Sequence, residues 1–372
     1  MQRRRLFKQL ALGTAGATFF SACSNSNQVF TPSDDEAAGG NGPLIEWRMA
    51  TSWPEDLDIV FGTAQEMCLR VGELTNGRFK ITAFPAGGIA PPFEILDTVQ
   101  NGSTECGHTA AYHYIAKNRA LAFATSVPFG FNPQQHQAWL YGAGGMELLR
   151  KLYANFNIVN FPAGSTGNQM GGWFREKINS VSDLQGLKMR IPGIGGEVLK
   201  RIGVEVQNMR PSELLLALER NTIDAAEWVG PYEDEKLGLN QYARYYYYPG
   251  WHEPGTTYDL IINRDAYEAL PESYRKALEV VAFEAQVRML SKYNAANREA
   301  LQRLISEGTE LTAYSAEILQ ATRQAADELY AEYSSQDAAF KEIYNDWNAF
   351  REGIYRWNNI NEGSYADLIA SS

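Results

Sequence analysis

The sequence predicts an α/β fold built as two lobes, with mixed sheets flanked by helices. Three observations lead to this class. A strand–helix–strand pattern occupies residues 44–85, a similar pattern recurs over residues 187–228, and a long helical pattern runs from 272 to 306. The chain has 372 residues, which is more than one typical core needs and favours two lobes.

The first lobe is predicted from consecutive short elements separated by turn residues. Asn76-Gly77 is a tight-turn signal between a helical pattern and a strand. Prolines open the next helical pattern and Asn-Gly ends it. The predicted elements are a strand at 44–53, a helix at 60–75, a strand at 78–85, a helix at 91–102 and a buried strand within 103–112.

The second lobe is predicted from an echo of the same unit. Residues 93–112 and 213–232 both pass from a helix through an Asn to an acid and small residues at a strand. In open α/β sheets, ligands bind outside the carboxyl ends of the strands. We therefore expect Gly107-His108-Thr109 and Glu227-Trp228 on opposing lips of one cleft. The other predicted elements are strands at 187–193 and 204–209 and helices at 195–203 and 213–221.

The last third of the sequence is helical. At 1.5 Å per residue, the helix predicted at 272–306 is about 50 Å long, which exceeds one lobe, so we expect it to run along both. Two amphipathic helices are expected at 315–335 and 340–360. The predicted lobes are residues 44–167 with about 257–305, and residues 168–256 with about 306–372.

The first residues predict export. Arg3, Arg4, Arg5 and Lys8 precede an apolar run that is too short to span a membrane. The Arg-Arg-x-apolar-apolar-Lys pattern resembles a twin-arginine signal, which implies a periplasmic protein. Residues 1–22 are therefore expected to be an export signal.

A lipid anchor is a further expectation for the mature N-terminus. Phe20-Ser21-Ala22-Cys23 resembles a lipobox, which would make Cys23 a lipidated first residue; plain cleavage and release is the alternative. Residues 23–43 are polar, contain Gly and Pro, and are expected to form a flexible tether. Such a tether suits a protein that works near a membrane.

Composition and charge exclude two classes of partner or cofactor. The net charge of −11 and the lack of a basic stripe argue against nucleic acid. Besides Cys23 there are only Cys68 and Cys106, and no Cys-x-x-Cys motif, so a zinc site is not expected. Cys68 and Cys106 are expected to be buried thiols.

Two glycine-bounded segments offer weak signals for a ligand. Residues 193–196, Gly-Ile-Gly-Gly, lie between a strand and a helix, but Val198 stands where a dinucleotide fingerprint needs glycine. Arg190, at the end of the preceding strand, can form a fork to a carboxylate; an ordinary surface arginine is an equal alternative. Residues 166–174, with Asn168 and Gln169 between glycines, favour a hinge loop by themselves.

Acids next to aromatic residues leave two kinds of chemistry open. Glu227 and Glu253 could act as a glycosidase pair, although nothing in the sequence fixes their separation. They could also bind a hard cation together with amide and main-chain oxygens. The acids Glu233, Asp234 and Glu235, after the Gly-Pro turn, are expected to be solvated.

The sequence resembles the DctP-like solute receptors of TRAP transporters over residues 45–366. The resemblance rests on the stretches ECGHTAAYHYIAKN, NQMGGWF, LQGLKMRIPGIGGEVLKRIGVE, ALERNTIDAAEWVGPYEDEKLGL and YYYYPGWHEPG. It implies a two-lobed periplasmic solute-binding fold with hinge strands and a helix that crosses both lobes. It also implies a binding protein rather than an enzyme.

The subgroup that this chain resembles implies a small 2-oxo or 2-hydroxy monocarboxylate ligand, such as pyruvate or lactate, bridged to the protein by a metal ion. Sodium is expected ahead of calcium. Arg190 would bind the ligand carboxylate, and Gln169, Glu227, Trp228 and Glu253 would ligate the ion. The remaining residues implied for the ligand site are Gln169, Trp228, His108, Thr109, Tyr112 and Asn168. His252 stands where the subgroup often has an aromatic residue.

The resemblance also implies partners and leaves rivals. The receptor would deliver its ligand to the small and large TRAP membrane subunits, and a homodimer through the C-terminal helix is compatible with the aromatic tail. A receptor for a C4-dicarboxylate or a sugar acid is one alternative. An exported hydrolase that uses Glu227 and Glu253 is the alternative of another class.

Overall fold

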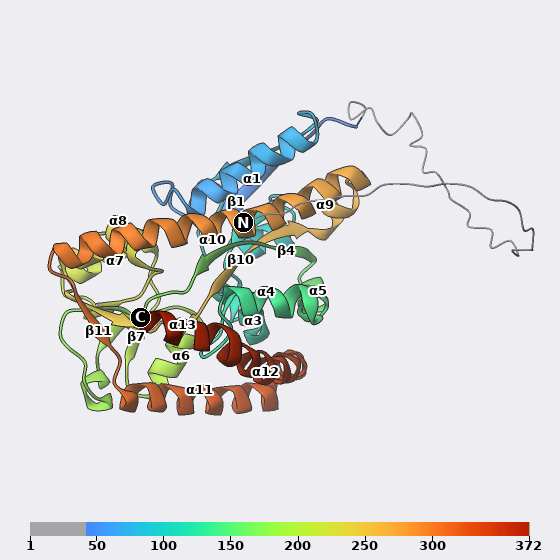
Figure 1. Ribbon diagram of the computed structural model, residues 1–372. Coiled ribbons are helices and arrows are strands. Elements are labelled where there is room, and N and C mark those ends of the chain that lie inside the picture. The colour runs from blue at the N-terminus through green and yellow to red at the C-terminus, as the bar shows by residue number, and fades with distance from the viewer. Residues whose placement is uncertain (1–41, 372) are drawn as a thin grey trace, which may run out of the picture. The chain divides into compact units, whose positions relative to one another are not determined.

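Two mixed β-sheets form the framework of residues 42–371, which are the residues that this computed structural model describes (Figure 1). The predicted export signal lies outside these residues, as does nearly all of the predicted tether. The first sheet has the strand order β2-β1-β3-β10-β4, and the second has the order β11-β9-β5-β8-β6-β7. Both sheets combine parallel and antiparallel pairs and are covered by helices, so the predicted α/β class is confirmed.

In the first sheet, three parallel strands are extended by an antiparallel pair. β1 pairs with β2 and β3, and β10 lies antiparallel between β3 and β4. The strands are β1 (Ile45–Thr51), β2 (Phe79–Phe84), β3 (Cys106–Thr109), β4 (Ile158–Gly167) and β10 (Thr256–Asn263). All eight residues of β10 are buried, because strands lie on both sides of it and helices cover the sheet.

The helix α1 (Val60–Leu74) packs on this sheet through an apolar face with helical spacing, which includes Val60, Ala64, Met67 and Val71. The turn after it has the positive φ angles that Asn76-Gly77 predicts, 50° and 72°. The next helix, α2 (Ile95–Gln100), is shorter than predicted. Pro92 disfavours helical backbone at Pro91, and residues 91–94 form a turn in which the Glu94 N–H donates to the Pro91 oxygen at 3.0 Å, so the helix starts only at Ile95.

The second sheet is made of short strands. β6 pairs in parallel with β7 and β8, β9 pairs in parallel with β11, and β5 lies antiparallel between β8 and β9. The strands are β5 (Gly172–Phe174), β6 (Lys188–Arg190), β7 (Glu205–Gln207), β8 (Ala225–Ala226), β9 (Tyr245–Tyr248) and β11 (Glu310–Ala313). The helices among them are α6 (Gly193–Arg201), α7 (Pro211–Glu219) and α8 (Pro231–Lys236).

The remaining helices before the C-terminal third accompany the first sheet. Asn132 and Gln135 form a capping box at the start of α4, which fixes where that helix begins. The helices are α3 (Ala122–Thr125), α4 (Pro133–Gly142), α5 (Gly145–Ala154) and α9 (Arg264–Glu268). We call the elements around the first sheet the first lobe and those around the second sheet the second lobe.

Three connections carry the chain between the lobes before residue 310. The segment 168–171 joins β4 to β5, and the segment 249–255 joins β9 back to β10. The third is the predicted long helix, confirmed as α10 (Glu272–Ser306). It packs on β4 and α1 of the first lobe and on α8 of the second, and Figure 1 shows it running past both sheets.

Helices complete the chain. α11 (Ala316–Gln336) packs on α6, and α12 (Ala338–Asn358) packs on α11 and also on α4 and α5. A short π-helical turn leads into α13 (Ser364–Ala370). Trp357 at the end of α12, Ile360 in this turn, and Tyr365 and Leu368 in α13 are exposed. The described residues belong to one compact unit, so the residue boundaries of the two lobes stay a prediction.

Within residues 42–371, no helix has both the length and the apolar character that a membrane crossing requires. Cys68 and Cys106 are both buried and unpaired, as expected.

Candidate functional site

Arg190 is buried at the carboxyl end of β6, with 1% of its surface exposed. β6 pairs with β8 so that Arg190 lies beside Ala226, and this register brings the guanidinium to Glu227. Its Nη1 donates to the main-chain oxygen of Glu227 at 2.5 Å and lies 3.5 Å from the carboxylate. The guanidinium also lies over the Trp228 ring, 5.1 Å from its centroid. The alternative that Arg190 is an ordinary surface arginine is therefore wrong.

Glu227 follows β8 directly and is also buried, with 1% exposure. Its main-chain N–H donates to the Arg190 oxygen at 2.9 Å, which continues the β6–β8 pairing to the lip. Burial raises the pKa of Glu227 well above its usual value, and Arg190 opposes this only in part. The Glu227 carboxyl group would therefore lose its proton readily only if a second positive charge, besides Arg190, were close to it.

His252 and Glu253 reach the same place from the segment 249–255. His252 Nε2 lies 3.2 Å from Glu227 Oε1 but outside hydrogen-bond geometry, so neither atom has a hydrogen-bond partner. Burial lowers the pKa of His252 to about 4, which makes the ring neutral at pH 7. Burial, reinforced by the charge of Glu227, raises the pKa of Glu253 to about 7.

Gln169 ties the two hinge segments together. Its Nε2 donates to Thr256 Oγ1 at 2.8 Å and to Thr166 Oγ1 at 3.2 Å. Thr256 in turn donates to Glu253 at 2.7 Å, so the amide and the acid share one threonine. The Gln169 Oε1 atom is buried without a hydrogen-bond partner. The predicted residues Gln169, Arg190, Glu227, Trp228 and Glu253 are thus brought together.

The first-lobe residues of the predicted site have a different environment. His108 accepts from Trp53 Nε1 at 2.8 Å through Nδ1, and its Nε2 therefore donates to the Ala163 oxygen at 3.1 Å. Thr109 Oγ1 is bonded to Ser52 and to Tyr114 at 2.7 and 2.8 Å. Their predicted contacts to a ligand stay a prediction.

Tyr112 faces the cluster and Asn168 does not. The charges of Glu253, Glu227 and Arg190 all act on the pKa of Tyr112, which burial raises well above its usual value. Asn168 is exposed, whereas the other residues of the predicted site are buried; with Gln169, Pro249 and Trp251 it lines a surface groove of about 380 Å³. Its predicted role is therefore the one that the geometry supports least.

Sequence reasoning missed Tyr258 and misjudged two acids. Tyr258 lies on β10 beside Trp53, and the charges of Glu253 and Glu227 reach it. All residues of its strand are buried, so no alternation of exposed and buried positions singled it out. Glu233 and Asp234 are 1% exposed, so the expectation that they are solvated is wrong.

A hard cation fits this donor set. Within residues 42–371, no three His, Cys, Asp or Glu side chains are grouped so that they could hold a metal ion by themselves. A cation here would need neutral oxygens besides the carboxylates, which sodium and calcium accept. Gln169 Oε1 is such a neutral oxygen, and both it and the carboxylate oxygen Glu227 Oε1 are buried without a hydrogen-bond partner.

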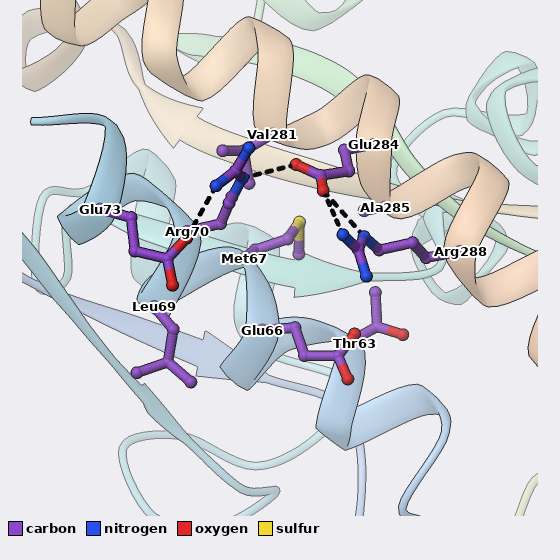
Figure 2. A pocket seen from close by; sticks show the side chains of 10 residues that line it. All are labelled: Thr63, Glu66, Met67, Leu69, Arg70, Glu73, Val281, Glu284, Ala285 and Arg288. Carbon is purple, nitrogen blue, oxygen red and sulfur yellow. Dashed lines mark hydrogen bonds and ion pairs between the residues drawn. The ribbon is translucent and has the colours of Figure 1, made fainter.

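A second concave region lies elsewhere, between α1 and α10. Figure 2 shows Arg70 and Arg288 both meeting Glu284 in this pocket of about 190 Å³. Its charges are paired with one another on the surface, and it contains none of the predicted site residues. It therefore does not compete with the buried cluster as a ligand site.

Three relatives identify the kind of protein that this chain is similar to. A "Monocarboxylate 2-oxoacid-binding periplasmic protein" of Nostoc sp. is 53% identical over 324 residues, 87% of this chain and 86% of the relative. A TRAP transporter solute-binding protein of Bordetella bronchiseptica, a dimer with calcium and picolinate, is 45% identical with a TM-score of 0.87, covering 88% of this chain and 98% of that one. A TRAP periplasmic solute-binding protein of Pseudoalteromonas atlantica with sodium and pyruvate is 38% identical with a TM-score of 0.84, covering 87% and 98%.

The family model described as "Bacterial extracellular solute-binding protein, family 7" matches residues 49–337, which include both sheets. The relatives agree with it over nearly all of the described residues. The chain therefore belongs to this family, the DctP family, and is a periplasmic solute receptor of the TRAP-transporter class.

Proposed function

We propose that this receptor binds a small 2-oxo or 2-hydroxy monocarboxylate, pyruvate or a close analogue, together with a metal ion. The observation that carries the proposal is the buried cluster of Arg190, Glu227, Glu253 and Gln169, in which Arg190 Nε, Glu227 Oε1 and Gln169 Oε1 have no hydrogen-bond partner. The Nostoc relative is named for 2-oxo acids, and the Pseudoalteromonas structure holds pyruvate.

The charges of the cluster explain why an ion is needed. A carboxylate ligand can be matched by Arg190, but the two acids nearby would repel it. A cation held by Glu227, Glu253, Gln169 Oε1 and the Trp228 carbonyl would remove that repulsion. We propose sodium ahead of calcium, in line with the sodium and pyruvate of the Pseudoalteromonas protein; the Bordetella protein holds calcium.

The ligand contacts follow from the same geometry. Arg190 Nε is buried without a hydrogen-bond partner and would donate to the ligand carboxylate. Tyr112, and with it the unpredicted Tyr258, would close the site from the first lobe. His108 and Thr109 would shape that wall, since their own hydrogen bonds are already made.

A calorimetric titration tests the ligand and the ion together. Pyruvate, 2-oxobutyrate, lactate, succinate and a sugar acid are titrated into the protein in choline chloride with a chelator, and again after sodium or calcium is restored. We expect the monocarboxylates to bind only when the ion is present. Tightest binding of succinate or the sugar acid would favour the rival receptor class, and equal affinity without ions would contradict the metal site.

We propose that the protein is not an enzyme. The rival hydrolase would use Glu227 and Glu253, but Arg190 lies 3.5 Å from the Glu227 carboxylate, and Glu253 accepts from Thr256. We expect no turnover of chromogenic glycosides. Turnover that Glu227→Gln abolishes would contradict the proposal.

We propose export by the twin-arginine-like signal, lipidation at Cys23 and delivery of the ligand to the small and large TRAP membrane subunits, without a nucleic-acid partner. Mass spectrometry of the mature N-terminus would distinguish a lipidated Cys23 from simple cleavage.

We also propose a homodimer through the exposed face of α12 and α13, since the Bordetella relative is a dimer. Light scattering of the protein and of Trp357→Ser would test it.

A further inference from the structure

Two buried carboxylates on α8 lie directly behind the proposed site. Glu233 and Asp234 follow Glu227-Trp228, the second-lobe lip of the cleft, by only a few residues, and each is 1% exposed. Asp234 accepts from the main-chain N–H groups of Val229 and Gly230 at 3.1 and 3.0 Å, so it fixes the turn after the lip. Neither acid is a ligand in the proposed site, so their burial calls for another explanation.

Glu233 joins the lip to the long helix. Its Oε2 accepts from the Trp228 indole N–H at 2.9 Å, and its Oε1 accepts from the hydroxyl of Tyr293 on α10. Tyr293 is fully buried, so its ring cannot turn away. The carboxylate therefore holds the indole against a helix that packs on both lobes.

The orientation of Trp228 bears directly on Arg190. The guanidinium lies over the face of this ring, 5.1 Å from the centroid, and donates to the main-chain oxygen of the preceding residue. A cation over an aromatic face is attracted only while the face is presented to it. A rotation of the indole would therefore remove the surface on which the guanidinium rests.

The chemistry of Glu233 suits this role in a way that an amide does not. Both neighbouring groups, the indole N–H and the tyrosine hydroxyl, donate, and a carboxylate accepts through both oxygens. A glutamine would present one NH₂ group to a donor, and one of the two bonds would be lost. The position is thus selective for an acid although the acid touches no ligand atom.

We propose that Glu233 is a positioning residue for ligand binding: it fixes the Trp228 ring and thereby the Arg190 guanidinium that receives the ligand carboxylate. This inference rests on the proposed function.

The test measures pyruvate affinity by calorimetry, in the ion that supports binding, for wild type and Glu233→Gln. We expect roughly tenfold weaker binding in Glu233→Gln, together with a changed near-ultraviolet circular dichroism signal from Trp228. Asp259→Asn is the matched control, because Asp259 is also fully buried and bonded to a tyrosine, Tyr153, but its side chain has no hydrogen bond to a residue of the proposed site. It should bind pyruvate within twofold of wild type.

Trp228→Phe separates positioning from general loss of structure. It keeps the main-chain carbonyl and an aromatic face but removes the indole N–H, so by itself it should weaken binding about as much as Glu233→Gln. In this background Glu233→Gln should cause little further loss. Full additivity of the two changes, or affinities within twofold of wild type for either single variant, would overturn the inference.

The outcomes also separate this inference from the proposed function. If the wild-type protein binds none of the monocarboxylates in any ion, the proposed function fails and this inference fails with it. If the wild type binds and Glu233→Gln binds equally well, only the inference fails. If Glu233→Gln does not fold, Trp228→Phe alone decides, and wild-type affinity in that variant overturns the inference.

Discussion

The two walls of the proposed site contain buried histidines with opposite hydrogen bonding. In the first lobe, both ring nitrogens of His108 are bonded, to Trp53 and to Ala163. In the hinge segment on the other side, neither nitrogen of His252 has a hydrogen-bond partner. Burial lowers the pKa of both rings to about 4, so burial alone does not distinguish them.

The difference teaches where ligand chemistry is expected. A buried polar atom without a partner is costly unless something else satisfies it. On the first-lobe wall, His108 and Thr109 already have hydrogen-bond partners, so this wall can only set the shape of the site. On the second wall, polar atoms of Arg190, Glu227 and His252 have no hydrogen-bond partner and are available to a ligand. Substitutions on the second wall should therefore change affinity, and those on the first wall should change stability.

The largest expected effect is on the second wall. Arg190→Met should weaken pyruvate binding by at least about 100-fold, because a charge-assisted contact to the ligand is lost and its removal leaves two acids uncompensated. Lys188→Met is the control, since Lys188 lies on the same strand but is exposed. Calorimetry should show wild-type affinity for the control, and unchanged affinity of Arg190→Met would contradict the assignment.

On the first-lobe side, Asp259 should affect stability and its pH dependence. Burial raises the pKa of Asp259 from 3.8 to about 7, so the folded protein retains a proton that the unfolded chain releases between these values. Its contribution to the free energy of unfolding therefore falls as pH rises from about 4 to 7 and is constant above. Tyr153 and Tyr141 are the titratable groups that sense its charge.

Asp259→Asn should remove this slope, which amounts to roughly 2–4 kcal/mol. The asparagine can still accept from Tyr153, and its NH₂ group can donate to the unpaired Asn160 Oδ1. Urea unfolding of both proteins at pH 5 and pH 8 measures the difference. A parallel pH dependence in the two proteins would contradict the protonated state of Asp259.

The two histidines give the most direct test of the comparison. His108→Asn should lower the free energy of unfolding by about 1–3 kcal/mol with little change in pyruvate affinity, because Trp53 and Ala163 lose their partner. His252→Asn should do the reverse, with affinity weakened several-fold and stability nearly unchanged. Thermal unfolding and calorimetry on both variants measure the two effects. Equal behaviour of the two variants would break the comparison.

The smallest expected effect is at the rim where the lobes meet. Asp58, between β1 and α1, pairs with Lys236 and accepts from Tyr232 at 3.0 Å, both on α8. This pair is partly exposed, so Asp58→Asn should reduce affinity by less than about 1 kcal/mol, and the difference should vanish at high salt. Asp56→Asn in the same loop is a control for loss of one negative charge. A loss of affinity that does not depend on salt would contradict an effect of the Asp58–Lys236 ion pair.

The sequence predicted the long helix and the strand–helix units well because their signals are local. Pro271 before α10, Asn-Gly turns and apolar spacing lie within the elements that they define. The convergence of Arg190 with Glu227 was expected from the resemblance, whereas the rule on the carboxyl ends of strands predicted only that Gly107-His108-Thr109 and Glu227-Trp228 lie on opposing lips of one cleft. The shared threonine of Gln169 and Glu253 was not, since it joins residues 169 and 253 through a side chain on a third element.

Burial of the acids on α8 could not be read from the stretch PYEDEK. Locally these residues are a charged turn after Gly-Pro. Their burial depends on donors that come from distant strands and from α10, such as Trp173 and Tyr246 for Asp234. Tyr258 was missed for a related reason: in a strand that is buried throughout, the local sequence gives no sign of which side chain faces a neighbouring lobe.

The Gly-Ile-Gly-Gly stretch after β6, the first turn of α6, lies against both the hinge segment and the first lobe. A Cβ at Gly195 would lie 2.7 Å from the Cβ of His252, and one at Gly193, whose φ is 63°, would lie 3.4 Å from that of Tyr112. Residues 193–196, which lack the third glycine of a nucleotide-binding motif, thus set how closely the second lobe can approach the hinge segment and the first lobe. The added methyl group of an alanine at position 195 would push His252 away from Glu227 even without a ligand.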